Sequence, residues 1–202
     1  MKTNRTPLYL DIDGRLVEAS VQRAREQEKI YGHNTGHFRL EVEKENTVMG
    51  VIGEFLVRQT LIDIAKSNSI LVEVDHTTFG APLDLKLTVP GRREEFGVHV
   101  KTGLWNQWPQ ETFEFGVHAD QKIEFSNSPL ILVTLLKSRG SYPKKARIEG
   151  FIKSHDLRRA KVIKRGDEFP STGVISRTDN YLTRFSQYED VKLIFQSALG
   201  LV

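Results

Sequence analysis

Two neighbouring segments decide the fold, Leu83-Asp-Leu-Lys-Leu-Thr-Val89 and Phe96-Gly-Val-His-Val-Lys101, with the turn signal Pro90-Gly91 between them. Apolar and polar residues alternate in both segments, which is typical of strands with one buried face. Ile70-Leu-Val-Glu-Val74 has the same β-branched character. The three segments therefore predict three consecutive strands that form an antiparallel meander.

Helical and apolar segments flank this predicted meander. Thr47 to Ala65 carries an apolar face at helical spacing, and Thr47 is a plausible N-cap. A short helix is expected over residues 118–126. Leu130 to Leu136 is continuously apolar, as in a strand buried on both faces, and Ala146 to Lys153 predicts another strand. This order predicts an α/β fold with a mixed central sheet flanked by helices.

The two ends of the chain lie outside this pattern. Leu8 to Asp13 alternates and predicts a short strand, and residues 15–31 predict a polar helix. We therefore expect residues 1–46 to form an N-terminal extension packed on the core, and residues 47–202 to form the α/β domain. Near the C-terminus we expect a strand from Val174 to Arg177 and an amphipathic segment from Val191 to Phe195.

The composition excludes several classes of protein. The 202-residue chain contains no cysteine, so disulfides, thiolate metal sites and cysteine nucleophiles are excluded. No apolar run approaches the ~20 residues needed to cross a bilayer. The sequence also lacks a phosphate-binding glycine loop and a Gly-x-Ser-x-Gly elbow. These features predict a soluble, cytoplasmic protein without membrane association.

Basic residues are concentrated in one part of the chain. The net charge is only +3, but residues 137–165 contain 11 basic residues against two acidic ones, Glu149 and Asp156. A basic stretch of this density suits a polyanion such as nucleic acid, although a solvated, lysine-rich surface would have the same composition. The candidate phosphate contacts are Lys144, Lys145, Arg147, Arg158, Arg159, Lys161, Lys164 and Arg165.

Three ionisable side chains of the predicted meander, Asp84, His99 and Lys101, are candidates for a common site. Asp84 lies within the second predicted strand, where an isolated aspartate can also simply face solvent. His99 and Lys101 project to one face of the third strand, because side chains alternate along a strand. If the two strands pair through the turn, Asp84 meets His99 and Lys101 at one end of the sheet. A carboxylate there can hold a hard divalent cation, and a lysine can act on an attacking water.

These residues carry a resemblance to a known family. Gly53-Glu54 on a helix, Asp84 on a strand and His99-x-Lys101-Thr102-Gly103 on the next strand resemble the PD-(D/E)XK nuclease superfamily. The branch whose third motif reads Val-Gln-Val-Lys-Thr is similar. The resemblance covers about residues 47–153 and implies a restriction-endonuclease-like αβββαβ core.

The resemblance also implies an activity. It implies a divalent-metal-dependent endodeoxyribonuclease that uses Mg²⁺ or Mn²⁺. Asp84 would be the principal metal ligand together with the backbone carbonyl of Val100, Glu54 would reach a metal-bound water, and Lys101 would act on the attacking water. DNA is the expected partner, in a restriction, defence, recombination or homing role. One such site cuts one DNA strand, so many nucleases of this kind cut both strands as dimers. A homodimer is therefore a possible partner arrangement for this chain.

His99 departs from the family pattern, in which Glu or Asp stands two residues before the lysine. Imidazole is a poor ligand for Mg²⁺ but acceptable to Mn²⁺. His99 therefore orients water, binds a softer metal, or marks a site that has lost activity. The last interpretation makes the chain a catalytically silent nucleic-acid-binding or assembly subunit. A third hypothesis is a protein–protein adaptor whose basic stretch is only a solvated surface.

Two further groups of residues have alternative interpretations. Trp105, Trp108, Phe113 and Phe115 can stack on unpaired bases or belong to the core, and the core is favoured. His76 follows the first strand of the meander, where it can approach the site or be a loop histidine without a functional role, and the loop histidine is favoured.

Overall fold

The computed structural model describes residues 6–35, 41–77, 83–92, 95–118 and 128–199; side chains are described from residue 44 onward in the second range and only up to residue 30 in the first. No helix within these ranges is long and apolar enough to cross a bilayer. The strands are β1 (Leu8–Asp11), β2 (Glu73–His76), β3 (Leu85–Thr88), β4 (Phe96–Trp105), β5 (Glu114–His118), β6 (Leu130–Ser138), β7 (Ser141–Ile152), β8 (Lys161–Ile163) and β9 (Asn180–Arg184). The helices are α1 (Gly14–Thr35), α2 (Glu41–Ser67), α3 (Ser154–Arg158) and α4 (Val191–Leu199), with a 3₁₀ turn over Phe185–Gln187.

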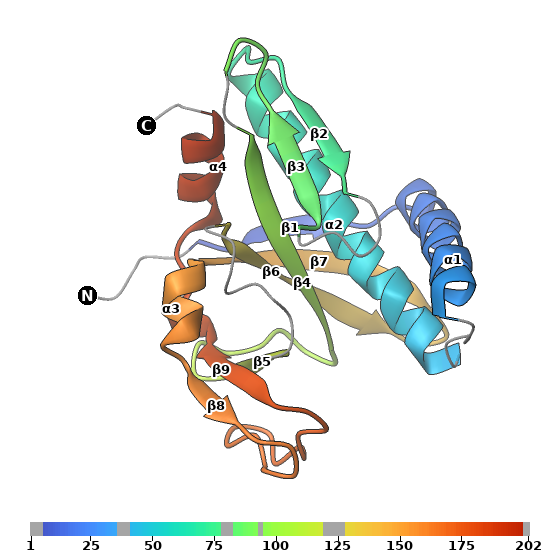
Figure 1. The fold of residues 1–202 in the computed structure, drawn as a ribbon, viewed down its shortest axis with the longest axis vertical. Coiled ribbons are helices and arrows are strands. Elements are labelled where there is room, and N and C mark those ends of the chain that lie inside the picture. Colours follow the sequence, from blue (N-terminus) through green and yellow to red (C-terminus); the bar gives the residue numbers. More distant parts are fainter. Residues whose placement is uncertain (1–5, 36–40, 78–82, 93–94, 119–127, 200–202) are drawn as a thin grey trace.

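Six strands form the main sheet, in the order β1-β7-β6-β4-β3-β2 (Figure 1). The predicted meander is confirmed, because β2 pairs antiparallel with β3 and β3 pairs antiparallel with β4. β4 and β6 are parallel, whereas β7 returns antiparallel to β6 and β1 pairs antiparallel with β7. The fold is therefore mixed α/β, with a mixed sheet flanked by helices as the sequence predicts.

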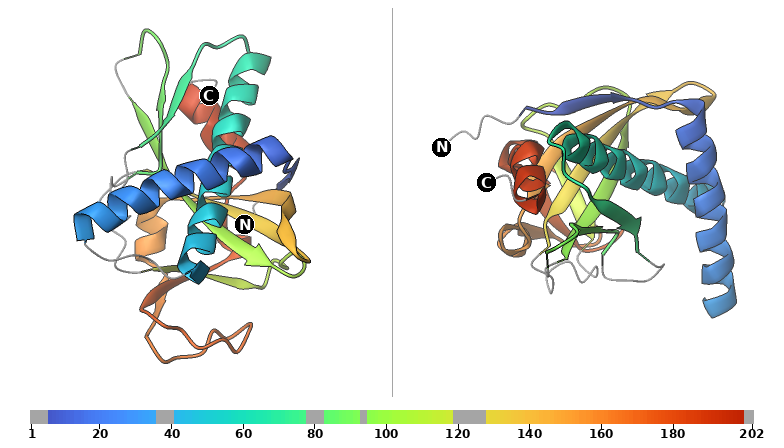
Figure 2. Two further views of the ribbon diagram at one scale, coloured as in Figure 1. Left: turned by 90° about the vertical axis from the view of Figure 1, so that its right-hand side faces the viewer. Right: turned by 90° about the horizontal axis from the view of Figure 1, so that it is seen from above.

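The two faces of the sheet bury separate cores. On one face α2 packs on β4, α4 packs on β7, and α1 crosses the outer side of α2 (Figure 2). Ile131, Val133 and Leu135 of β6 belong to this first core. Leu130 and Leu132 belong to a second core that includes residues of β5 and of the 3₁₀ turn. This division explains the uninterrupted apolar sequence of β6, since both faces of the strand are buried.

Close approach of α2 to β4 depends on a glycine. A Cβ built on Gly53 would lie 2.0 Å from Oγ1 of Thr102, a separation that no real Cβ tolerates without movement of its neighbour. Glycine therefore allows the helix to sit directly on the strand at this level. The next residue of α2 is Glu54, so this contact also fixes the height of Glu54 along β4.

Residues 41–46 extend α2 beyond the predicted start. Thr47 therefore lies inside the helix, and its prediction as an N-cap is wrong. The preceding residues include glutamate and lysine, which are good helix formers and continue the helix without an apolar pattern. The expected boundary between residues 46 and 47 consequently falls within α2. Within the expected N-terminal extension, β1 is hydrogen-bonded to β7 and thereby joins the main sheet.

A second sheet in the order β5-β9-β8 was not predicted. Its strands have only three to five residues, and their partners are distant in sequence. Pairing thus depends on tertiary contacts rather than on local pattern. The predicted strand from Val174 to Arg177 is wrong, since only an isolated bridge between Glu168 and Ile175 forms there.

The structure also bears on the predictions for the aromatic residues and for two further segments. Trp105, Phe113 and Phe115 pack against the second core, which confirms the core interpretation for these three. The amphipathic segment from Val191 forms α4. The helix expected over residues 118–126 falls almost entirely outside the described residues; only His118 is described, as the last residue of β5.

Substitution of Gly53 by alanine should destabilise the fold by about 1–3 kcal/mol, because the added methyl group overpacks the contact with Thr102. Gly50 in the same helix is the matched control, since nothing lies within 4 Å of a Cβ built there. Gly50→Ala should be neutral or stabilise the protein by up to about 1 kcal/mol. Urea denaturation measures both values. Equal free energies of unfolding for the two variants would contradict the close contact.

Candidate active site

Asp84 lies immediately before β3, not within the second strand as predicted, and is bonded to the backbone of β4. β3 pairs with β4 only as far as Val98, so the amide of Val100 has no partner from β3. The Asp84 carboxylate takes this position, because Oδ2 accepts a hydrogen bond from the Val100 N–H at 2.7 Å. The backbone amide of Asp84 donates to the carbonyl of Val98 at 3.1 Å. Asp84 is therefore held against the strand that carries Lys101.

Lys101 lies in the middle of β4, beside Leu132 of β6 in the parallel register. Its side chain is partly buried, and this burial lowers the pKa of the ammonium group from its ordinary value. The negative charges of Asp84 and Glu54 oppose this effect and raise the pKa. The lysine therefore lies within the electrostatic reach of both carboxylates, although one comes from the residue before β3 and the other from α2.

His99 is almost completely buried, with 4% of its surface exposed. Burial lowers the pKa of its imidazole, the charge of Asp84 raises it, and the charge of Lys101 lowers it further. The net direction is downward, so the imidazole is predominantly neutral at about pH 7. Its backbone amide donates to the carbonyl of Pro129 at 2.9 Å, which ties β4 to the start of β6.

Glu54 is contacted by two side chains, one that the sequence favoured as a loop histidine and one that it did not single out. Nδ1 of His76, the last residue of β2, lies 3.1 Å from Oε2 of Glu54. Arg23 of α1 approaches the same oxygen, with Nε at 3.9 Å. The expectation that His76 is a loop histidine without a role was thus incomplete, because the ring lies at the site. Nothing in the local sequence of a polar helix distinguishes Arg23 from its neighbours.

Most of the candidate phosphate contacts lie at the surface. Arg158 and Arg159 lie at the end of α3, and Lys161 begins β8. These residues, with Lys144, Lys145, Lys164 and Arg165, are exposed. Lys164 is paired with Asp179 at 2.7 Å, and Lys145 is paired with Asp11. Arg158, Arg159 and Lys161 come from the end of α3 and the start of β8, which is an edge strand of the second sheet in the lower part of Figure 1.

Arg147 departs from the expected surface position. It is 7% exposed, and its Nε lies 2.6 Å from Oε1 of the fully buried Glu149. The guanidinium also donates to the carbonyl of Pro109 at 3.0 Å and lies over the rings of Tyr9 and Trp108. The contacts of Arg147 join β1, β7 and the segment after β4, so the residue has a structural role. The prediction that Arg147 contacts phosphate at the surface is therefore wrong, because its guanidinium group is internal.

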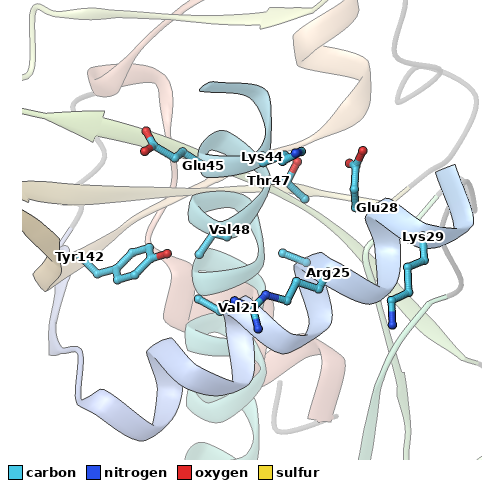
Figure 3. Close-up of a pocket in the computed structure, with 10 residues that line it drawn as sticks. Val21, Arg25, Glu28, Lys29, Lys44, Glu45, Thr47, Val48 and Tyr142 are labelled. Carbon is cyan, nitrogen blue, oxygen red and sulfur yellow. The ribbon is translucent and has the colours of Figure 1, made fainter. Parts of the chain in front are cut away.

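A cavity of about 510 Å³ lies between α1, α2 and Tyr142 of β7 (Figure 3). Both signs of charge line it, including Arg25, Glu28 and Lys44. It contains none of the predicted site residues, and its mixed charge does not select one class of ligand.

Oxygen donors at the site suit a hard cation. Within the described residues, no group of three or more Asp, Glu and His side chains is close enough to hold a metal ion. Mg²⁺, however, is usually bound through only one or two carboxylates and keeps several waters. The Asp84 and Glu54 carboxylates, with the carbonyl of Val100, would supply oxygen donors of this kind. By donor chemistry the residues therefore fit Mg²⁺ or Mn²⁺, and His99 is not needed as a ligand.

Comparison with models of known protein families, with curated proteins and with solved structures gives no match. The similarity to the PD-(D/E)XK superfamily accordingly rests on the motifs and their order along the chain.

Acidification should destabilise the protein through His99. The pKa of His99 is lowered in the folded state, so the unfolded state binds more protons below about pH 6.5. The free energy of unfolding should fall as the pH decreases from there toward the folded pKa, by about 1.4 kcal/mol per unit of the pKa difference. Urea denaturation between about pH 7 and about pH 5 tests this. His99→Gln should flatten the slope, and an unchanged slope would contradict the assignment.

Proposed function

We propose that this protein is a divalent-metal-dependent endonuclease of the PD-(D/E)XK type that hydrolyses phosphodiester bonds in DNA. The observation that carries the proposal is that the Asp84 carboxylate is bonded to the Val100 amide at 2.7 Å, next to Lys101, while the charges of Asp84 and Glu54 both raise the pKa of this lysine. Burial of a lysine is costly for a fold, and a partly buried lysine under the influence of two carboxylates is characteristic of functional sites. The order α2, β2-β3-β4 and a β6 parallel to β4 also supports the proposal, since these elements match part of an αβββαβ core. The second helix of that core would fall in residues 119–127, outside the described residues.

Asp84, Glu54 and the carbonyl of Val100 would hold the cation. When bound, a divalent cation neutralises charge on the phosphoryl oxygens and lowers the pKa of water. The Asp84 carboxylate is prepared for this role, because its bond to the Val100 amide fixes its orientation through Oδ2.

Lys101 would act on the attacking water. Its lowered pKa increases the neutral fraction of the amine, which can accept a proton as the water oxygen attacks phosphorus. A P–O bond forms to the water oxygen, one ester P–O bond breaks, and solvent protonates the leaving oxygen. The resulting ammonium group then lies beside the negative charge that develops on the phosphoryl group.

The exposed basic residues beside the second sheet would bind the DNA backbone. Phosphate contacts release condensed counterions, so such binding weakens steeply as salt increases. Arg158, Arg159, Lys161 and Arg165 suit this role because they are exposed and come from a continuous region of the chain. Lys164 is partly neutralised by Asp179 and is expected to contribute less.

A second candidate function is a catalytically silent nucleic-acid-binding or assembly subunit of the same fold. The observation that favours it is His99, which stands where an acid is usual and is buried and neutral. It therefore adds no negative charge to attract a cation. The two candidates differ in cleavage but agree in salt-sensitive binding.

Cleavage should require both Asp84 and Lys101. We expect wild type to cut supercoiled plasmid or a single-stranded oligonucleotide with Mg²⁺ or Mn²⁺. Lys101→Met should reduce the rate by about 10²–10⁴-fold, as expected for loss of a general base. Asp84→Asn should abolish cutting but keep an acceptor for the Val100 amide, whereas alanine would leave that donor unpaired at a cost of about 1–3 kcal/mol.

Lys86→Met is the matched control for the cleavage assay. Lys86 lies on β3 and forms an exposed ion pair with Glu95. This variant should cut like wild type. If wild type cuts no substrate with either cation yet binds DNA in a salt-sensitive manner, the silent-subunit function is favoured.

Removal of surface cations should change the salt dependence of DNA binding. Arg158→Ala, Arg159→Ala and Lys161→Ala should each make the slope of log K against log [salt] shallower by about 0.9 for each phosphate that the variant no longer neutralises. Lys66→Ala is the control, since Lys66 lies in the last turn of α2, far from α3 and β8 in Figure 1. Fluorescence anisotropy with labelled duplex gives the slopes. Equal slopes for all four variants would contradict this binding surface.

A further inference from the structure

Glu54 lies where three elements meet around one carboxylate. It projects from α2, His76 reaches it from the end of β2, and Arg23 reaches it from α1. Both neighbours contact Oε2, which leaves Oε1 outside these two interactions. The side chain of Glu54 is largely buried, with 15% exposed, so its position is determined by protein rather than by solvent.

His76 is placed to orient this carboxylate. A carboxylate accepts hydrogen bonds but does not donate them, so the hydrogen at the 3.1 Å contact belongs to Nδ1 of His76. The ring is itself fixed, because it packs on Phe55 with ring centroids 4.6 Å apart and only 10% of its side chain is exposed. The carboxylate thus receives a donor whose direction cannot easily change.

Arg23 brings the N-terminal helix to the same carboxylate. Its Nη2 donates to the backbone carbonyl of Thr77 at 3.1 Å, and its Nε lies 3.9 Å from Oε2 of Glu54. The amide of Thr77 in turn donates to the carbonyl of Asp84 at 3.0 Å. Arg23 therefore connects α1 with the carboxylate of Glu54 and, through Thr77, with the backbone of Asp84, even though the family resemblance does not extend to residues 1–46.

We propose that His76 and Arg23 are positioning residues that hold Oε2 of Glu54, so that Oε1 is directed toward the cation. This inference rests on the proposed function. A free glutamate side chain loses rotamer entropy when it binds a cation, and fixed partners remove part of that cost beforehand. Partners of metal-binding carboxylates typically change metal affinity by about 10–100-fold. The N-terminal extension is thereby an integral part of the site.

Calorimetric titration of Mn²⁺ into the full-length protein without nucleic acid tests the inference. His76→Phe keeps the packing on Phe55 but removes the donor, and Arg23→Met keeps bulk but removes charge. Each should weaken Mn²⁺ binding by about 10-fold or more. His76→Asn retains an N–H near the position of Nδ1 and should restore most of the affinity relative to His76→Phe.

Controls separate positioning from folding and from the cation site itself. Arg25→Met, on the same helix, should bind Mn²⁺ like wild type. Far-ultraviolet circular dichroism and thermal unfolding establish that each variant is folded, and a variant that unfolds is replaced by His76→Gln or Arg23→Gln. Asp84→Asn and Glu54→Gln define the binding expected when a ligand is removed.

The outcomes are distinguishable. Weak binding by His76→Phe and Arg23→Met, with normal binding by Arg25→Met, is the expected result. Wild-type affinity in both positioning variants, together with weak binding by Asp84→Asn, overturns the inference and leaves the cation site standing. Wild-type affinity in only one of them overturns the role of that residue. If wild type binds no Mn²⁺, or binds it equally after Asp84→Asn and Glu54→Gln, the proposed cation site is overturned and the inference with it.

Discussion

The contact of Gly53 with Thr102 is the constraint on which the site depends. A side chain at position 53 would force either α2 or the side chain of Thr102 to shift, because its Cβ would overlap Thr102. With glycine there, α2 lies directly on the strand at the centre of the sheet. Glu54 follows at once along the helix, so a packing requirement in the core also determines where a functional carboxylate lies.

The site also depends on the position at which β3 begins, Leu85. Pairing with β4 stops at Val98, and beyond this point the strand would have an unsatisfied amide at Val100. The Asp84 carboxylate satisfies it, so a residue of the candidate site replaces a strand hydrogen bond. The negative charge of the same carboxylate raises the pKa of both Lys101 and His99. Stability and the proposed chemistry therefore share one side chain, and a change at Asp84 affects both.

The N-terminal segment contributes more than an added layer. β1 covers the edge of β7, where Arg147 is enclosed by Tyr9, Trp108 and Glu149. α1 packs on α2 and brings Arg23 to Glu54. β1 therefore helps to enclose the buried guanidinium group of Arg147, and α1 brings the guanidinium group of Arg23 to the site. The short second sheet, by contrast, lies beside exposed basic residues.

The sequence by itself determined the meander, the apolar strand β6 and the placement of His99 and Lys101 on the strand next to Asp84, because alternation and turn residues are local signals. Only the tertiary structure decided that Arg147 is internal, that β5, β8 and β9 form a sheet, and that His76 and Arg23 surround Glu54. These features arise from contacts between residues far apart in the chain. Local pattern does not encode such contacts, since an arginine in a polar helix has the same sequence signature whether it faces water or a carboxylate.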